Sequence, residues 1–294
     1  MLQINASIAR HHDKTWCVFR TQHLYNFNAE NILTELDKNL EPISDKPLIA
    51  ENNNTAFEDI RLFSFKGKLL AFYNYLPFQE NIGWKIIYAV GYGEIDLETG
   101  ILKNQVSMRG ASKRFHEKNW SPYNYQDELF MVTDFDPFLR VIKIDLFNEQ
   151  SKVTEIFLSP LQTKGWAYGE LRGGTPLITK PGTDDGWYYG FIHSFLPDEM
   201  GFQRNYYYTI VRYSHIHKYF EYHPQPLPYA DDEPDEDYTL LWRLSNGRRF
   251  KVIFPIGIMH HEDGVMVSFG KDDVCSYYEY FSWDKIEELF ATVD

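Results

Sequence analysis

The chain has 294 residues and a formal net charge of −13 at pH 7. Nucleic-acid affinity comes largely from Lys and Arg side chains that displace counterions, so this acidic balance argues against a nucleic-acid partner. No stretch of the sequence approaches the roughly 20 apolar residues that a membrane helix requires, and a strand-like run begins already at Asn5, which leaves no room for a signal peptide. We therefore expect a cytoplasmic protein that is not bound to a membrane.

One pattern recurs five times along the chain: an apolar run that opens with polar or cationic residues, a polar turn, and a second apolar run. The copies span residues 5–20, 58–73, 118–132, 172–193 and 255–269. Units of roughly 50 to 80 residues that contain strands are typical of a propeller with four-stranded blades. The aromatic content of 17% also suits sheets that pack face to face. We predict an all-β fold, a five-bladed β-propeller that spans residues 1–294 as a single domain.

The remaining segments predict outer strands, one helix and one long loop. Further apolar runs indicate strands at Ile86–Val90, Arg140–Ile144, Tyr206–Val211 and Leu240–Leu244. Asn246-Gly247 is typical of a hairpin turn. Residues 283–290 form a short C-terminal helical pattern, which we expect to pack under the last blade. The acidic, Pro-containing segment 223–237 has no periodicity and is predicted to be a surface loop rather than a metal site.

The two cysteines, Cys17 and Cys275, each lie in or beside an apolar run. This placement predicts two buried, reduced thiols. The alternative is a disulfide that joins the first and last blades.

Polar residues occupy the positions where the five repeats begin. The first strand of each blade lines the axis of a propeller, so these positions should converge on one funnel. They are Asn5, Ser7, Glu58, Asp59, Arg61, Lys118, Asn119, Arg172, Thr175 and either His260 or His261. Charge is costly to bury without a partner, so the set predicts a site for a polar ligand. The alternative is an internal network of salt bridges that locks the blades together.

Five short motifs follow one another along the chain. They are Asn5-Ala-Ser-Ile, Glu58-Asp-Ile-Arg61, Arg172-Gly-Gly-Thr-Pro, the strand from Trp187 to His193, and Gly270-Lys-Asp-Asp273. They resemble the motifs of glycoside hydrolase family 130 (GH130), a family of inverting β-mannoside phosphorylases and related β-1,2-mannosyl-transferring enzymes, in order and approximate spacing over nearly the whole chain. The family has the five-bladed fold that the repeats predict.

The resemblance implies a role for each matching residue. It makes Asp59 the general acid and places Arg172 and His193 on the anionic side of the site, where Lys118 is a further candidate for binding phosphate. The candidates for binding the sugar are Asn5, Ser7, Glu58, Arg61, Asn119, Asp136, Tyr206 and Asp273. Aromatic residues near the mouth, which include Trp120, Tyr123, Trp166, Tyr206 and Tyr208, are candidates for stacking on sugar faces or for packing.

One acid is chemically sufficient when phosphate is the nucleophile, whereas an inverting hydrolase needs a second carboxylate to activate water. The motifs contain one such acid and several cations, which favours phosphorolysis of β-mannosides, or synthesis from a sugar 1-phosphate, over hydrolysis. Inorganic phosphate or a sugar 1-phosphate would then be the co-substrate, and we expect no metal and no other cofactor. The expected partner is a small sugar or oligosaccharide, and the protein could also form oligomers.

The third repeat departs from the family pattern. The phosphorylases carry an Arg near the end of its second strand, where this chain has the sequence Met131-Val-Thr-Asp-Phe-Asp-Pro137. Asp134 and Asp136 would repel a phosphate ion unless Arg114, Lys118 and Arg172 compensate. Asp136 acting as a base would instead favour hydrolysis.

Two other classes of function stay open on the sequence alone. A propeller can bind a glycan or a protein at its mouth without catalysis, because the fold by itself does not determine function. A transferase that uses a nucleotide sugar is the second class, although the sequence contains neither a Gly-rich nucleotide loop nor the usual metal-binding pair of acids.

Overall fold

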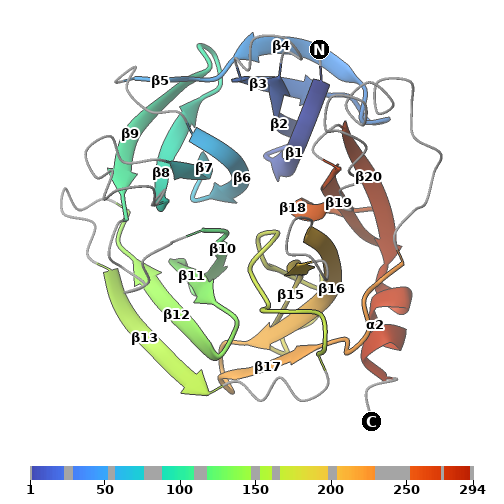
Figure 1. Cartoon of the computed structure of the whole chain (residues 1–294). Coiled ribbons are helices and arrows are strands. Elements are labelled where there is room, and N and C mark those ends of the chain that lie inside the picture. The colour runs from blue at the N-terminus through green and yellow to red at the C-terminus, as the bar shows by residue number, and fades with distance from the viewer. Residues whose placement is uncertain are drawn as a thin grey trace.

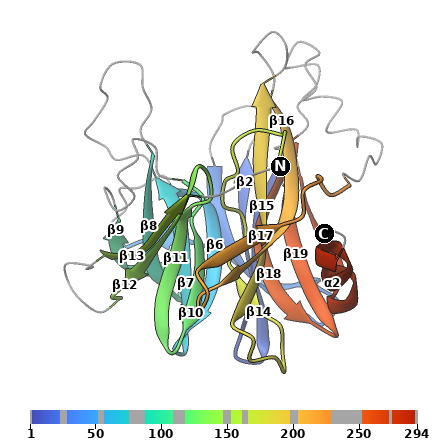
Figure 2. The ribbon, with the colours of Figure 1, turned by 90° about the horizontal axis from the view of Figure 1, so that it is seen from below.

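The structure is a computed structural model, and it describes residues 2–22, 29–51, 57–75, 88–108, 118–146, 153–160, 166–197, 204–228, 252–272 and 275–291. In the described residues, five sheets surround a central axis as the blades of a propeller (Figure 1). The strands run roughly along that axis, and the short helix α2 (Trp283–Ala291) lies at the periphery (Figure 2). The predicted five-bladed β-propeller with a C-terminal helix is therefore confirmed.

Within each blade, consecutive strands pair antiparallel and the chain moves outward from the axis. Blade I contains β1 (Leu2–His11), β2 (Lys14–Gln22), β3 (Ala29–Leu36) and β4 (Pro42–Pro47). Blade II contains β6 (Phe57–Phe65), β7 (Lys68–Tyr75), β8 (Ala89–Asp96) and β9 (Ile101–Ser107), and the short strand β5 (Ile49–Ala50) pairs parallel with β9. Blade III contains β10 (Ser121–Tyr125), β11 (Glu128–Asp134), β12 (Phe138–Ile144) and β13 (Val153–Pro160). Blade IV contains β14 (Ile178–Thr179), β15 (Trp187–Pro197), β16 (Arg204–Ser214) and β17 (Tyr219–Tyr222). Blade V contains β18 (Ile253–His261), β19 (Gly264–Lys271) and β20 (Cys275–Ser282).

The five sequence repeats coincide with the inner strand pairs of the five blades. Four of them form regular hairpins, β1–β2, β6–β7, β10–β11 and β18–β19. In blade IV the innermost strand is reduced to β14 and to a single bridge between Arg172 and His193. The predicted strands Arg140–Ile144 and Tyr206–Val211 correspond to β12 and β16, whereas Ile86–Val90 overlaps β8 only at residues 89–90, and residues 86–87 lie outside the described part of the chain. The predicted strand Leu240–Leu244, the turn Asn246-Gly247, and residues 229–237 of the acidic loop lie outside the described residues.

The hydrophobic core consists of five clusters, each of which joins two neighbouring blades. One of them joins the first blade to the last, because Ile8 and Cys17 of blade I pack with Met259 of β18. Alternation along each strand gives every blade two apolar faces, and each face is buried against the next blade. Closure of the ring therefore depends on side-chain packing between the first and last blades.

The helix α2 joins blade V to blade IV. Trp283, Ile286 and Phe290 pack in the same cluster as Tyr189 of β15. Glu287, on the same helix, accepts a hydrogen bond of 3.2 Å from the Tyr189 hydroxyl. The helix thus packs against the last blade as expected, and it also contacts the blade before it.

The cysteines follow the sequence prediction only in part. Neither forms a disulfide, so no such bond joins the first and last blades, but Cys275 is exposed while Cys17 is buried. The prediction of a buried Cys275 is wrong because this residue starts β20, the outermost described strand of blade V, whose side chains are mostly half-exposed. Burial raises the pKa of the Cys17 thiol to about 12, so this thiol is unreactive at neutral pH.

His215 lies among aromatic rings where blades III and IV meet. Its ring stacks on that of Tyr125 with centroids 4.2 Å apart, and its Nδ1 lies 2.9 Å from the Tyr123 hydroxyl. Burial, assisted by the charge of Lys218, lowers the pKa of His215 from 6.5 to about 4. The folded protein therefore holds a neutral ring at a pH where the unfolded chain binds a proton.

We expect the free energy of unfolding to decrease as the pH falls from 6.5 towards 4, and the variant His215→Gln to show a shallower decrease. Urea denaturation at several pH values measures both slopes. Burial also lowers the pKa of His11, His193 and His260, but these residues are present in both proteins, so the difference between the slopes reports His215. Identical slopes would contradict the prediction.

Among the described residues, no helix is long and apolar enough to cross a membrane.

Candidate active site

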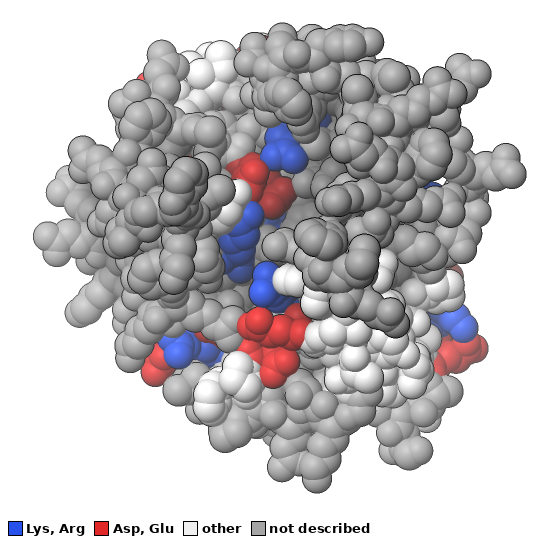
Figure 3. Space-filling view, in the orientation of Figure 1, with Lys and Arg blue, Asp and Glu red and all other residues white. Residues whose placement is uncertain are grey.

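A cavity of about 700 Å³ lies at the hub of the propeller and receives side chains from all five blades. Figure 3 shows it as a hollow near the centre of one face, with acidic and basic side chains exposed inside it. Ten of the residues named from the sequence line this cavity. They are Asn5, Glu58, Asp59, Lys118, Asn119, Trp120, Asp134, Arg172, His193 and Tyr206.

The other named residues lie elsewhere. Ser7 and Arg61 are buried behind the cavity wall, and Asp136 lies in the turn between β11 and β12 and does not line the cavity. Asp273 and Arg114 lie outside the described residues. Of the aromatic candidates, Trp120 and Tyr206 line the cavity, whereas Tyr123, Trp166 and Tyr208 do not.

Backbone irregularities at the start of three inner strands aim polar side chains at the axis. Asn5, Asp59 and Asn119 adopt left-handed conformations with φ of 56°, 52° and 62°. The pairing of β1 with β2 and of β6 with β7 shifts register at these points. Asn and Asp tolerate this conformation better than other non-glycine residues, and such strain is concentrated at functional sites. The left-handed backbone at these three positions thus favours Asn or Asp, and the same residue types bring a polar side chain to the hub.

The carboxylate of Asp59 is held by two amide groups. Asn5 Nδ2 donates to Oδ1 at 2.7 Å, and Asn74 Nδ2 donates to Oδ2 at 3.1 Å. Gly270 allows the first contact, because a Cβ at that position would lie 2.0 Å from Asn5 Oδ1. Both oxygens of Asp59 are therefore oriented by groups from blades I and II.

Arg61 connects the blades and does not contact the cavity. Its guanidinium donates to the Gly174 carbonyl at 2.5 Å, to the Asp59 carbonyl at 2.8 Å and to Asn119 Oδ1 at 3.1 Å. Burial lowers the pKa of Arg61 to about 10. Ser7 has a similar role, since its Oγ accepts a hydrogen bond of 3.0 Å from the backbone N–H of Leu62. These residues link the blades by hydrogen bonds beneath the cavity, whereas the alternative from the sequence was a network of salt bridges.

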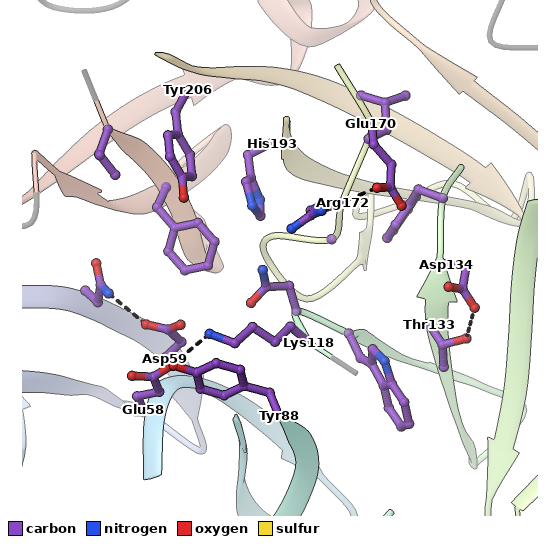
Figure 4. A pocket seen from close by; sticks show the side chains of 18 of the residues that line it. Glu58, Asp59, Tyr88, Lys118, Thr133, Asp134, Glu170, Arg172, His193 and Tyr206 are labelled. Atoms are coloured by element: carbon purple, nitrogen blue, oxygen red, sulfur yellow. Dashed lines mark hydrogen bonds and ion pairs between the residues drawn. The ribbon is translucent and has the colours of Figure 1, made fainter. Parts of the chain in front are cut away.

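A second group of charges lies beside Asp59 (Figure 4). Glu58 pairs with Lys118 Nζ at 2.9 Å and with Arg20 Nη1 at 3.2 Å. The Lys118 ammonium also lies 3.2 Å from the centroid of the Tyr88 ring. Lys118 is thus held near Asp59 by a carboxylate on one blade and an aromatic face.

Arg172 and His193 face each other across the narrow inner edge of blade IV. Their backbones exchange hydrogen bonds of 2.8 and 3.0 Å. His193 is 2% exposed, and its Nδ1 has no hydrogen-bond partner among the described residues. Burial, and then the charges of Arg172 and Arg61, lower its pKa well below 6.5, so the imidazole is neutral. The Arg172 guanidinium lies 3.3 Å from Glu170 Oε2, and its side chain is 40% exposed.

The cavity contains three carboxylates in addition to Asp59, more than the motifs indicated. Each of the three has a cationic partner: Glu58 has Arg20 and Lys118, Asp134 has Arg140 at 3.4 Å, and Glu170 has Arg172. Asp59 is instead held by amides. This difference distinguishes Asp59 from the other acids of the cavity. Within the described part of the chain, no group of His, Cys, Asp and Glu could hold a metal ion.

Arg20 and Asn74 were missed for one common reason. Each follows the second apolar run of a repeat directly, as Gly270 does in the last repeat and as His193 ends that of blade IV. The second strands therefore deliver side chains to the same mouth as the first strands. Applying that rule to all five repeats, and not to His193 alone, would have identified Arg20 and Asn74. Glu170 carries no comparable signal apart from its position two residues before Arg172.

No protein-family model matches the chain, and no curated protein is similar to it in sequence. Solved structures are similar in fold. One represents the GH130 family of mannoside phosphorylases, which contains glycoside hydrolases that target β-1,2-mannosidic linkages in Candida mannan; it is 11% identical, with a TM-score of 0.63 over 97% of this chain and 85% of that one. Two others are from Leishmania mexicana.

The first of these is a GDP-Man-dependent mannosyltransferase, 13% identical with a TM-score of 0.62, over 96% of this chain and 85% of that one. The second is a mannose phosphorylase in complex with a phosphate ion, 12% identical with a TM-score of 0.56, over 98% of this chain and 86% of that one. The chain therefore has the five-bladed fold of GH130 structures, at sequence identities that show the fold alone.

Proposed function

We propose that the protein is a carbohydrate-active enzyme that transfers glycosyl groups between β-mannosides or similar sugars and phosphate, with Asp59 as the general acid. The observation that carries this proposal is the composition of the hub cavity. Asp59 of blade II lies in the same cavity as Lys118, Arg172 and His193 of blades III and IV. An acid and a group of anion-binding side chains are the two elements that phosphorolysis needs.

In the proposed reaction, Asp59 donates a proton to the oxygen that bridges the two sugars. A phosphate oxygen attacks the anomeric carbon from the opposite face, the glycosidic C–O bond breaks, and the products are a sugar 1-phosphate and the shortened sugar. Arg172 supplies charge to the phosphate, while the neutral His193 lines the cavity beside it and adds no repulsive negative charge. Phosphate needs no base to activate it, so one acid suffices.

The solved structures support the substrate class. Those that are similar in fold include a mannose phosphorylase with phosphate, glycoside hydrolases and a mannosyltransferase. A carbohydrate-active enzyme is common to all three. The proposal that phosphate accepts the glycosyl group rests on the cationic side chains of the cavity, Lys118 and Arg172, and on His193.

Inverting hydrolysis is the second candidate, and the additional carboxylates favour it. Asp134 and Glu170 line the same cavity as Asp59 and could activate a water molecule, whereas Asp136, the candidate from the sequence, lies outside the lining. Both acids form ion pairs, Asp134 with Arg140 at 3.4 Å and Glu170 with Arg172 at 3.3 Å.

Product analysis distinguishes these reactions. We expect β-mannosides of several linkages to yield a sugar 1-phosphate only when inorganic phosphate is present, and the variant Arg172→Met to raise the KM for phosphate about tenfold or more, because it removes a charged hydrogen bond to the anion. Free mannose released without phosphate would establish hydrolysis instead. Turnover of GDP-mannose without phosphate would indicate a nucleotide-sugar transferase.

Binding of mannosides without turnover of any of these donors would contradict the proposal and would identify a noncatalytic binding propeller. Calorimetry with mannose, mannosides and phosphate measures that binding. The variant Arg10→Met is a suitable control for Arg172→Met, because Arg10 is exposed, lies outside the cavity and donates a hydrogen bond of 3.1 Å to Thr15 Oγ1, away from the site.

A further inference from the structure

Asn74 occupies a central position in the polar network beneath the cavity. It lies near the end of β7, and its side chain is almost completely buried, with 1% exposed. Its Nδ2 donates to Asp59 Oδ2 at 3.1 Å and to Asn119 Oδ1 at 3.2 Å, and its Oδ1 accepts from the Asn119 backbone N–H at 3.2 Å. The amide therefore connects the carboxylate of Asp59 to a residue on the next blade.

The orientation of this amide is determined by its neighbours. Exchanging its oxygen and nitrogen would place the oxygen against the Asp59 carboxylate and against Asn119 Oδ1, which are both acceptors. The nitrogen would then face the Asn119 N–H, which is a donor. The amide thus has one favourable orientation, in which both hydrogens of Nδ2 point at acceptors.

We propose that Asn74 is a positioning residue for the acid: it fixes the direction of the Asp59 carboxylate and couples that carboxylate to Asn119. The inference rests on the proposed function, because it takes Asp59 to be the group that donates the proton. Asn5 orients Oδ1 and Asn74 orients Oδ2, so rotation of the carboxyl group is restrained from both sides. Proton transfer depends on such alignment, which a small displacement weakens strongly.

Asn74 donates a hydrogen bond directly to the carboxylate of the proposed acid. A donor to a carboxylate favours its ionised form, so removing the donor lets the group keep its proton to higher pH. The charged and titratable groups around Asp59 are Glu58, Arg61, Tyr88 and Lys118. All of them remain in variants of Asn74, so a change in the pH profile can be assigned to the missing amide.

The test uses two variants of the full chain. In Asn74→Ala we expect kcat for the glycosyl transfer to fall about tenfold to a hundredfold, the loss expected for one hydrogen bond to a charged group, while the KM for phosphate changes little. In Asn74→Asp, which keeps the shape of the side chain, two carboxylates meet and cannot both ionise easily. We expect the alkaline limb of the pH profile to move upward by about one unit or more.

Carbon NMR of the carboxyl groups gives a second measurement that does not need turnover. The resonance that disappears in Asp59→Asn identifies Asp59, and its titration midpoint should lie at higher pH in both Asn74 variants. Tyr73→Phe is the matched control: it changes the preceding residue of β7, whose hydroxyl accepts from Gln105 Nε2 at 3.1 Å, and should leave the midpoint and the pH profile unchanged.

A folded Asn74→Asp protein with the pH profile, kcat and Asp59 midpoint of the unmodified protein would overturn the inference. If Asn74→Ala fails to fold, Asn74→Asp decides the matter by the same measurements. Full activity in Asp59→Asn would overturn the proposed function instead, so the two failures can be told apart.

Discussion

The variant Asp59→Asn is expected to lose about 10²- to 10⁴-fold in kcat for glycosyl transfer, because an amide cannot donate a proton to the leaving oxygen in the way a carboxylic acid does. The substitution keeps the size of the side chain, and Asn tolerates the left-handed conformation that Asp59 adopts, with φ of 52°. We therefore expect the protein to fold, and the loss to appear in the rate and not in the melting temperature. Steady-state assays with the best mannoside, together with thermal melts, measure the two effects.

Asp13→Asn is the control for this substitution. Asp13 is exposed in the turn between β1 and β2, and it does not line the cavity. The same chemical change there should leave kcat unaltered. Unchanged turnover in Asp59→Asn would contradict the role of Asp59 as the general acid. Asp134 and Glu170 would then be the candidates for that role.

The variant Arg61→Met should destabilise the folded protein by about 3–5 kcal/mol, the range of substitutions that leave several buried polar groups without partners. Arg61 is 1% exposed, and its loss removes the donor to two backbone carbonyls at the hub, those of Gly174 and Asp59, and leaves Asn119 Oδ1 with only its bond from Asn74. Arg61→Lys should rescue little, because an ammonium on a flexible stem cannot reproduce the planar fork. Urea denaturation measures the change in the free energy of unfolding.

Arg10→Met is the matched control here as well, since Arg10 is exposed and donates to Thr15, a residue of the neighbouring strand in the same blade. We expect it to change stability by about 0.5 kcal/mol or less, as is usual for surface substitutions. A loss of less than about 1 kcal/mol in Arg61→Met would contradict the view that Arg61 ties the blades together, given the unpaired acceptors that it should leave.

The role of Arg61 shows how one motif can serve two purposes. Glu58, Asp59 and Arg61 are close in sequence, and the family resemblance places Arg61 around the sugar. In the structure the bulge between Glu58 and Arg61 turns Glu58 and Asp59 towards the cavity and Arg61 into the protein. Strand alternation cannot foresee this, because a bulge changes which face each residue occupies. Because of this bulge, the buried hydrogen bonds of Arg61 lie directly beneath the solvent-accessible cavity that contains Glu58 and Asp59.

The sequence alone determined the fold and the region of the site. The repeated hairpins predict five blades because their period of apolar and polar residues is local, and a local pattern can be read without coordinates. The starts of those repeats likewise locate the hub, which is why Asn5, Asp59, Lys118, Asn119 and Arg172 line one cavity.

The tertiary structure decided how the charges are partnered. Glu58 pairs with Lys118 and Arg20, Glu170 pairs with Arg172, and Asn74 links Asp59 to Asn119. These contacts join residues that are up to 60 positions apart in the sequence. Such pairs follow from side-chain directions set by bulges and left-handed residues, and from blades that meet only after the ring has closed. Sequence patterns describe each strand, whereas the pairing of charges depends on distances between strands.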